Sequence, residues 1–300
     1  MSAPHSSRHP RDDATDVPMG LHASFYLPHA HPSVAAAVRH SLEAYQRAVG
    51  PRALTSYADE DGEWQPLDAQ GWEKVHRELT DAPWANVHLS GDSLEAPFRF
   101  DYLGREHVDA SFENGLGEVS AVSFWFSTRY VEQQGPQQVR DLLLALAEPL
   151  PFASGNAGLA FSGSIDVAAT LRHVRRACIR CPGLDVLRPS LTALRIGTRV
   201  RGPSWLTFLG APVLSKLGGT AALRSRLGAP DSTIQAMDEE RAVVTLGARP
   251  EASDGERGEE LSGYRELARI LEPWMLWGEG ESVLGLDPEA ARRWERRFLD

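Results

Sequence analysis

The chain has 300 residues, and 42% of them are hydrophobic, which is enough for the core of one large or two small domains and excludes disorder throughout. Its 41 acidic and 31 basic residues give a formal net charge of −10. This charge favours a basic partner and opposes binding to nucleic acid, although solubility alone also explains it.

Apolar runs and cysteine usage indicate where the chain works. No run reaches the roughly 18 apolar residues of a membrane-spanning helix, and residues 1–19 lack the apolar core of a signal peptide. The two cysteines are too few for a disulfide scaffold and suit a reducing compartment. We expect a disordered leader over residues 1–19, a single α+β domain over residues 20–300, a cytoplasmic location and no membrane partner.

Hydrophobic spacing predicts the elements of the first half of the chain. Residues 21–27 alternate like a half-buried strand, and apolar residues then recur at helical spacing until Gly50 and Pro51 end a helix. A second helix is expected after Asp68, a good N-cap. Strands with one face on the core are expected at residues 85–90, 98–102 and 118–131.

The second half mixes helices and strands without regular alternation. A strand is expected at residues 157–162 and a hairpin at residues 232–247. Helices are expected at residues 137–147, 166–180, 221–227 and 260–271, and a last one after Asp287. This pattern predicts an α+β fold with a mixed or antiparallel β-sheet flanked by amphipathic helices.

Cysteine and histidine pairs are the first candidates for chemistry. Cys178 and Cys181 have redox spacing, but they continue an apolar helical stripe, so burial is favoured over a redox or metal role. His29 and His31 are two residues apart, and the flanking prolines favour an exposed loop over half a metal site. We expect no metal and no cofactor.

The common enzyme signatures are absent from the sequence. It contains no GxxxxGK[ST], GxGxxG, GxSxG or HExxH motif. These absences favour binding over catalysis.

One stretch, "GPSWLTFLGAPVLSKLGG" at residues 202–219, is rich in apolar residues and has Lys216 as its only ionisable side chain. We expect Trp205 and Phe208 to fix a strand-to-helix corner in the core, with a helix starting near Ala211 and Pro212.

Three segments, which occur in the same order as in the family, resemble the TsiV-like family of bacterial type VI secretion immunity proteins. They are "CPGLDV" (residues 181–186), "GPSWLTFLGAPVLSKLGGTAALRSRL" (202–227) and "LGARPEASDGERGEELSGYRELARILEP" (246–273). The resemblance implies an antitoxin that binds a cognate toxic effector, often a nuclease, and it brings no agreed catalytic residues. It also implies that shared segments form the scaffold, whereas loops carry specificity.

Acidic turns are the candidate toxin-binding sites. Solvated turns are the simpler interpretation of each, but their charge suits a basic toxin and one of them adjoins a tryptophan. The candidate residues are Asp59, Glu60, Asp61, Glu63 and Trp64 in one turn, and Asp238, Glu239 and Glu240 in another. The alternatives are an enzyme or small-molecule-binding protein with an unrecognised pocket, and a structural part of a secretion apparatus.

Overall fold

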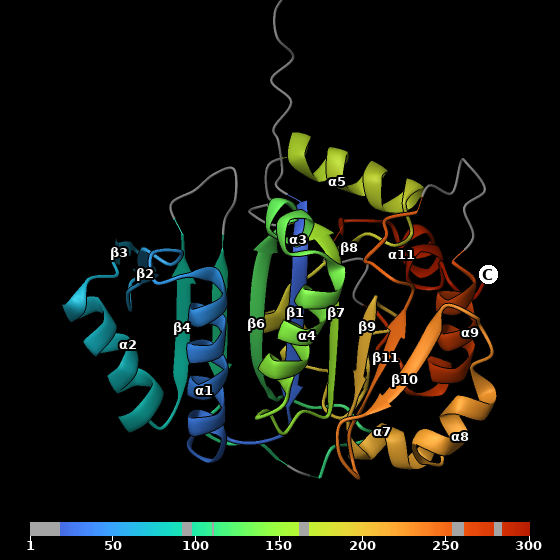
Figure 1. Ribbon diagram of the computed structural model, residues 1–300, viewed down its shortest axis with the longest axis horizontal. Helices are drawn as coiled ribbons and strands as arrows, with labels where there is room; N and C mark the ends of the chain where they lie inside the picture. The colour runs from blue at the N-terminus through green and yellow to red at the C-terminus, as the bar shows by residue number, and fades with distance from the viewer. Residues whose placement is uncertain (1–18, 92–97, 110, 162–167, 254–260, 279–283) are drawn as a thin grey trace, which may run out of the picture.

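The computed structural model describes residues 19–91, 98–109, 111–161, 168–253, 261–278 and 284–300. The expected leader lies outside the described residues except for Met19, which begins the first strand. Figure 1 shows a wide sheet with helices in front of it and at its ends.

The described strands form one eleven-stranded sheet. Its path runs through β10 (Ser232–Ala236), β11 (Ala242–Leu246), β9 (Leu206–Leu209), β7 (Ser154–Phe161), β1 (Met19–Leu27), β6 (Ser120–Ser127), β5 (Arg99–Gly104), β4 (Ala85–Ser90), β2 (Ser56–Ala58) and β3 (Trp64–Pro66). Neighbours on this path are antiparallel, and β8 (Asp185–Val186) pairs in parallel with the end of β7. The predicted α+β fold is therefore confirmed.

Two groups of helices accompany the sheet. The helices from the first half of the chain are α1 (His31–Val49), α2 (Ala69–Asp81), α3 (Thr128–Gln134) and α4 (Pro136–Ala147). The later ones are α5 (Ala168–Arg180), α6 (Pro189–Ala193), α7 (Ala211–Lys216), α8 (Gly219–Arg226), α9 (Ser262–Leu271), the short 3-10 helix η2 (Glu272–Trp274) and α11 (Pro288–Glu295). Figure 1 shows α1, α3 and α4 in front of the sheet, whereas α9, α8 and α7 lie around its β10 edge.

Aromatic rings fill the core between the central strands and the front helices. The ring of Phe25 lies 4.9 Å from that of Phe208 and 6.3 Å from that of Phe124, and Tyr45 of α1 packs on Phe124 at 5.3 Å. Trp205 and Phe208 are both buried, and α7 begins at Ala211. The predicted role of the apolar stretch at residues 202–219 is confirmed.

The helix predictions agree closely with the structure, and their caps explain why. Asp68 accepts hydrogen bonds from the N–H groups of Gln70 and Gly71 at the start of α2, and Asp287 caps α11 in the same way. Glycine ends α1 for a conformational reason. Gly50, its C-terminal cap, has a φ of 97°, which lies in the left-handed region that favours glycine.

Three sequence expectations were wrong in detail. The segment at residues 118–131 is not one strand, because Ser127 accepts a hydrogen bond from the N–H of Tyr130 and starts α3. His31 is not in an exposed loop: it opens α1, is fully buried, and its Nδ1 lies 2.9 Å from the hydroxyl of Tyr102.

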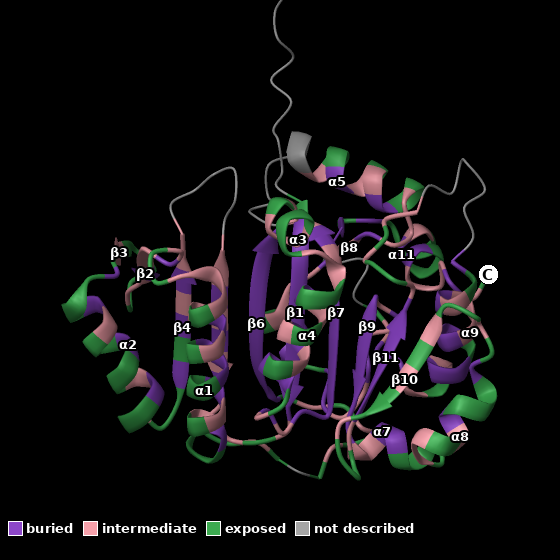
Figure 2. Ribbon diagram, viewed as in Figure 1, coloured by how far each residue is buried: buried purple, intermediate pink, exposed green. Residues whose placement is uncertain are grey.

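The central strands are also buried on both faces rather than one. Figure 2 shows β1 and β6 as buried along almost their whole lengths, and β7 as buried along its first half. On the second face of the sheet His22 and Ser24 of β1 and Ser123 of β6 are buried. Tyr26 on that face packs in a cluster with Ala193, Ile196 and Leu276 from later in the chain. The alternation of polar and apolar residues indicated a solvated face, and a second layer of the protein occupies it instead.

Candidate functional site

The first predicted acidic turn joins β2 to β3 at one edge of the sheet. The carboxylate of Asp59 accepts hydrogen bonds from the N–H groups of Asp61 (3.1 Å) and Glu63 (2.9 Å) and from Nε2 of Gln65 (2.8 Å). The bond from Gln65, followed by that from Glu63, lowers the pKa of Asp59. Asp59 therefore orders the turn.

The other predicted residues of this turn point into solvent. Glu60, Asp61 and Glu63 are exposed, and Trp64 on the edge strand is 56% exposed. Glu60 interacts electrostatically with Lys74, whereas the carboxylates of Asp61 and Glu63 make no hydrogen bond or ion pair with any described residue. These groups are available to a partner.

The second predicted turn joins β10 to β11. The carboxylate of Asp238 accepts hydrogen bonds from the N–H groups of Glu240 (2.9 Å) and Arg241 (2.6 Å) and from Nε of Arg241 (2.6 Å). Partial burial raises the pKa of Asp238, but these hydrogen bonds outweigh it, so the pKa lies below its usual value. Asp238 orders this turn as Asp59 orders the other.

Arg241 anchors the second turn to the end of α4. Its Nη1 donates to the carbonyl oxygens of Glu148 (3.0 Å) and Leu150 (2.6 Å), and its guanidinium lies 5.4 Å from the ring centre of Phe152. The exposed carboxylates of Glu239 and Glu240 form no hydrogen bond or ion pair within the described chain. Hydrogen bonds of Asp238 and Arg241 thus hold the turn in place, and the carboxylates of Glu239 and Glu240 remain available to a partner.

The structure does not bring the two acidic turns together. β3 and β10 are the two ends of the strand path, as Figure 1 shows. Nine inter-strand steps separate them, which corresponds to roughly 43 Å at about 4.8 Å per step. A standard interface of about 800 Å² per partner is roughly 32 Å across, so one such interface covers one turn only.

A recess near the second turn was not predicted. Four connections converge there: β1 to α1, α4 to β7, β9 to α7, and β10 to β11. They line a cavity of about 390 Å³, which we call the proline groove. Its lining residues are Pro28, His29, Pro149, Pro151, Phe152, Ala153, Ala211, Pro212, Glu240 and Arg241.

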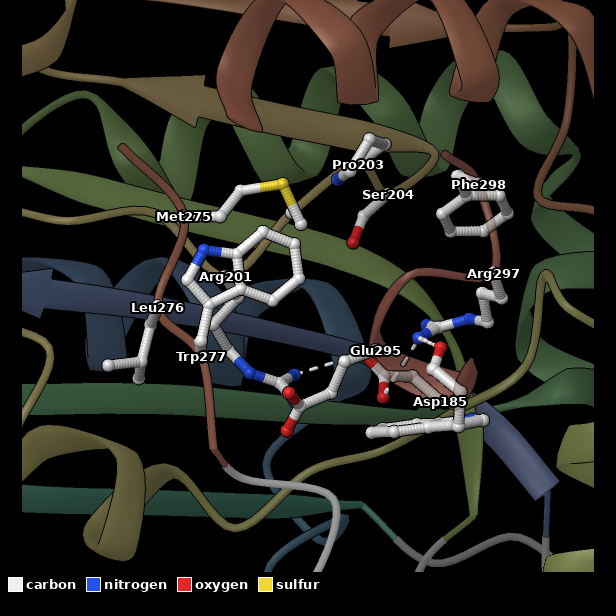
Figure 3. A pocket seen from close by; sticks show the side chains of 12 residues that line it. Asp185, Arg201, Pro203, Ser204, Met275, Leu276, Trp277, Glu295, Arg297 and Phe298 are labelled. Carbon is white, nitrogen blue, oxygen red and sulfur yellow. Dashed lines mark hydrogen bonds and ion pairs between the residues drawn. The ribbon is translucent and has the colours of Figure 1, made fainter. Parts of the chain in front are cut away.

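A cluster of charged side chains, also unpredicted, lies between β8, the segment before β9 and the C-terminal residues. Nη1 of Arg201 is 2.9 Å from one carboxylate oxygen of Asp185, and Nη2 of Arg297 is 4.0 Å from the other. Figure 3 shows the two guanidinium groups reaching Asp185 from opposite sides. The adjoining cavity of about 30 Å³ has room for about one water molecule.

Further contacts identify this cluster as a structural tie. Nε of Arg297 donates to the carbonyl oxygen of Pro182 (2.9 Å), and Nη1 donates to that of Trp294 (3.0 Å). Burial lowers the pKa of Arg297, and Asp185 opposes this shift. The cluster joins the C-terminal residues to the "CPGLDV" segment and leaves little space for a substrate.

The cysteine pair behaves as part of the core. Cys178 is buried on α5, Cys181 is half-buried, and the two do not form a disulfide. Burial raises the pKa of Cys178 to about 12, which suppresses the reactive thiolate. Among the described residues no group of three or more His, Cys, Asp or Glu side chains is placed to hold a metal ion.

The three segments that carry the family resemblance converge on this side of the sheet. The N–H of Gly183 donates to the carbonyl oxygen of Ala252, and a Cβ at Gly183 would lie 2.2 Å from the carbonyl oxygen of Glu251. Nε1 of Trp205 donates to the carbonyl oxygen of Gly247 (3.3 Å). The shared segments thus pack against one another as scaffold.

The fold and these sites define the class: an α+β protein built on one wide sheet, with exposed carboxylates in two of its turns. The chain belongs to the TsiV family, described as type VI immunity for VRR-NUC, whose family model matches residues 37–298. No curated protein matches the chain. Of the helices in the described ranges, none has the length and apolar character needed to cross a membrane.

A solved structure shares the fold. The Pseudomonas aeruginosa T6SS protein PA0821 superposes with a TM-score of 0.74 at 23% sequence identity, covering 93% of this chain and 81% of that chain. At this identity the likeness concerns the fold.

Proposed function

We propose that this chain is an immunity protein that binds a cognate nuclease effector of a type VI secretion system and blocks it by stoichiometric occlusion. The match to a family described as type VI immunity for VRR-NUC carries the proposal. A nuclease needs a basic surface for the phosphate backbone, and a chain of net charge −10 is suited to cover such a surface.

The acidic turns are the proposed contacts with the toxin. Glu60, Asp61, Glu63 and Trp64 at one edge, or Glu239 and Glu240 at the other, would meet lysine and arginine side chains that otherwise hold nucleic acid. Asp59 and Asp238 would act indirectly, because their carboxylates already hold the turns in shape. Since one standard interface spans only one turn, we propose that a single edge makes the main contact.

We also propose that the chain acts in the cytoplasm as one domain over residues 20–300. The continuity of the sheet supports the single domain, because β1 of the first half of the chain pairs with β7 of the second half and joins their strands in one path. The cytoplasm is where a nuclease meets the DNA of the cell. Protection there requires nanomolar affinity or better, near −12 kcal/mol.

Co-expression tests the proposal. The VRR-NUC effector from the same secretion gene cluster is expressed in a sensitive strain with this chain, with an unrelated acidic protein of similar size, or alone. We expect growth only with this chain, and a complex of fixed stoichiometry by light scattering. Continued killing despite abundant soluble chain would refute the proposed function.

A further inference from the structure

We propose that the proline groove, with Glu239 and Glu240 on its rim, is the docking surface for the effector, and that it takes an apolar side chain flanked by lysine or arginine. This inference rests on the proposed function and decides between the two acidic edges. It starts from the second predicted turn, because Glu240 of that turn itself lines the groove.

The walls of the groove are preformed. Four of its lining residues, Pro28, Pro149, Pro151 and Pro212, have the fixed φ of proline. Backbone bonds join the connections: the N–H of Ala153 donates to Tyr26, and that of Gly210 donates to Ala153, both at 2.9 Å. Binding to such a surface costs little ordering entropy, which a high-affinity inhibitor requires.

The chemistry of the groove selects its occupant. Its lining is mainly apolar, with four prolines, Ala153 and Ala211, so it suits a desolvated apolar side chain. The charge of Arg241 is engaged by Asp238 and by backbone carbonyls. The exposed carboxylates of Glu148, Glu239 and Glu240 then set the sign of the rim, and a basic protein is the complementary partner.

The β2–β3 turn also offers exposed carboxylates, together with Trp64 on the edge strand, but its residues do not line the proline groove. The carboxylate of Asp59 accepts its hydrogen bonds from groups within the turn and its hairpin. The β2–β3 turn therefore supplies a control with exposed carboxylates at the far edge of the sheet.

The test measures binding of the catalytically inactivated VRR-NUC effector from the same gene cluster to variants of the full chain. Ala211→Trp fills the groove, and Ala36→Trp on the exposed side of α1 is its control. The double reversal Glu239→Lys/Glu240→Lys is matched by Glu60→Lys/Asp61→Lys, which changes the net charge equally. Thermal melting shows whether each variant is folded. The two charge-reversal variants change exposed residues, so they still test the proposal if Ala211→Trp does not fold.

We expect Ala211→Trp to weaken the Kd at least about 30-fold. The Glu239/Glu240 reversal should weaken it about tenfold, mainly through a slower and less salt-dependent association, with both controls within about threefold. Wild-type affinity in both groove variants, or equal losses in both charge pairs, would overturn the docking site while leaving the immunity function intact. Absence of binding by the wild-type chain would overturn both, and self-association abolished by Ala211→Trp would assign the groove to a second copy instead.

Discussion

Replacing Asp185 by alanine should destabilise the fold while leaving the two acidic turns unchanged. The carboxylate lies 2.9 Å from Arg201 and 4.0 Å from Arg297, and the three side chains are 19%, 8% and 16% exposed. Without it, two largely buried guanidinium groups lose their shared counter-charge, which costs about 3–5 kcal/mol. At about 2 °C per kcal/mol for a chain of this size, the expected fall in Tm is about 6–10 °C.

Urea unfolding followed by tryptophan fluorescence measures this loss, because Trp277 and Trp294 line the adjoining cavity. Asp141→Ala is the control: its carboxylate is 60% exposed and 3.7 Å from Arg140, so its loss should cost less than about 1 kcal/mol. The apolar replacement Asp185→Leu/Arg201→Met/Arg297→Met should recover most of the stability. Wild-type stability of Asp185→Ala together with lost protection would refute the structural role and indicate a direct function for this carboxylate.

Three further predictions concern the core. Burial lowers the pKa of His22 from 6.5 to about 4. Below about pH 6.5 the unfolded chain therefore binds a proton at His22 that the folded chain does not bind until about pH 4. The free energy of unfolding should be unaffected by this group above about pH 6.5 and should fall by about 3 kcal/mol as the pH decreases towards 4. Urea unfolding at several pH values should therefore show a steeper acid loss in the wild type than in His22→Gln; parallel profiles would contradict this. Phe208→Ala should lower the free energy of unfolding by about 3–5 kcal/mol, because its ring contacts Phe25 at 4.9 Å and Phe152 at 5.8 Å; a loss below about 1 kcal/mol would be inconsistent with this packing. In the native protein an aromatic disulfide reagent should modify the half-buried Cys181 much faster than Cys178, whose pKa burial raises to about 12. Equal rates would show that Cys178 is not buried between α5 and the residues packed against it.

Local signals were enough to predict most elements of the fold. Capping residues such as Asp68 and Asp287 act within a few residues of themselves, so the start of a helix can be identified without knowing what it packs against. The short hairpin of β2 and β3 escaped prediction because three residues per strand are too few for a visible alternation. Likewise, β6 and α3 meet at Ser127 with no glycine or proline to mark the boundary.

The site was only partly predictable, because its parts meet through tertiary contacts. The acidic turns were visible as charge in turn-forming sequence, but their positions at opposite edges follow from the strand path. The pairing of Asp185 with Arg297 joins residues more than a hundred positions apart. In contrast, Asp238 followed three positions later by Arg241 was a local signal for an ordered turn that the sequence reasoning did not use.

Titration of the nuclease with this chain tests the central claim most directly. A fixed concentration of active VRR-NUC effector, well above the expected Kd, is mixed with increasing amounts of chain, and the DNA cleavage rate is measured. Stoichiometric occlusion predicts a linear fall to zero at a fixed molar ratio, reversed when the complex dissociates. Inactivation that continues at a chain concentration far below that of the nuclease, or full cleavage at excess chain, would contradict it.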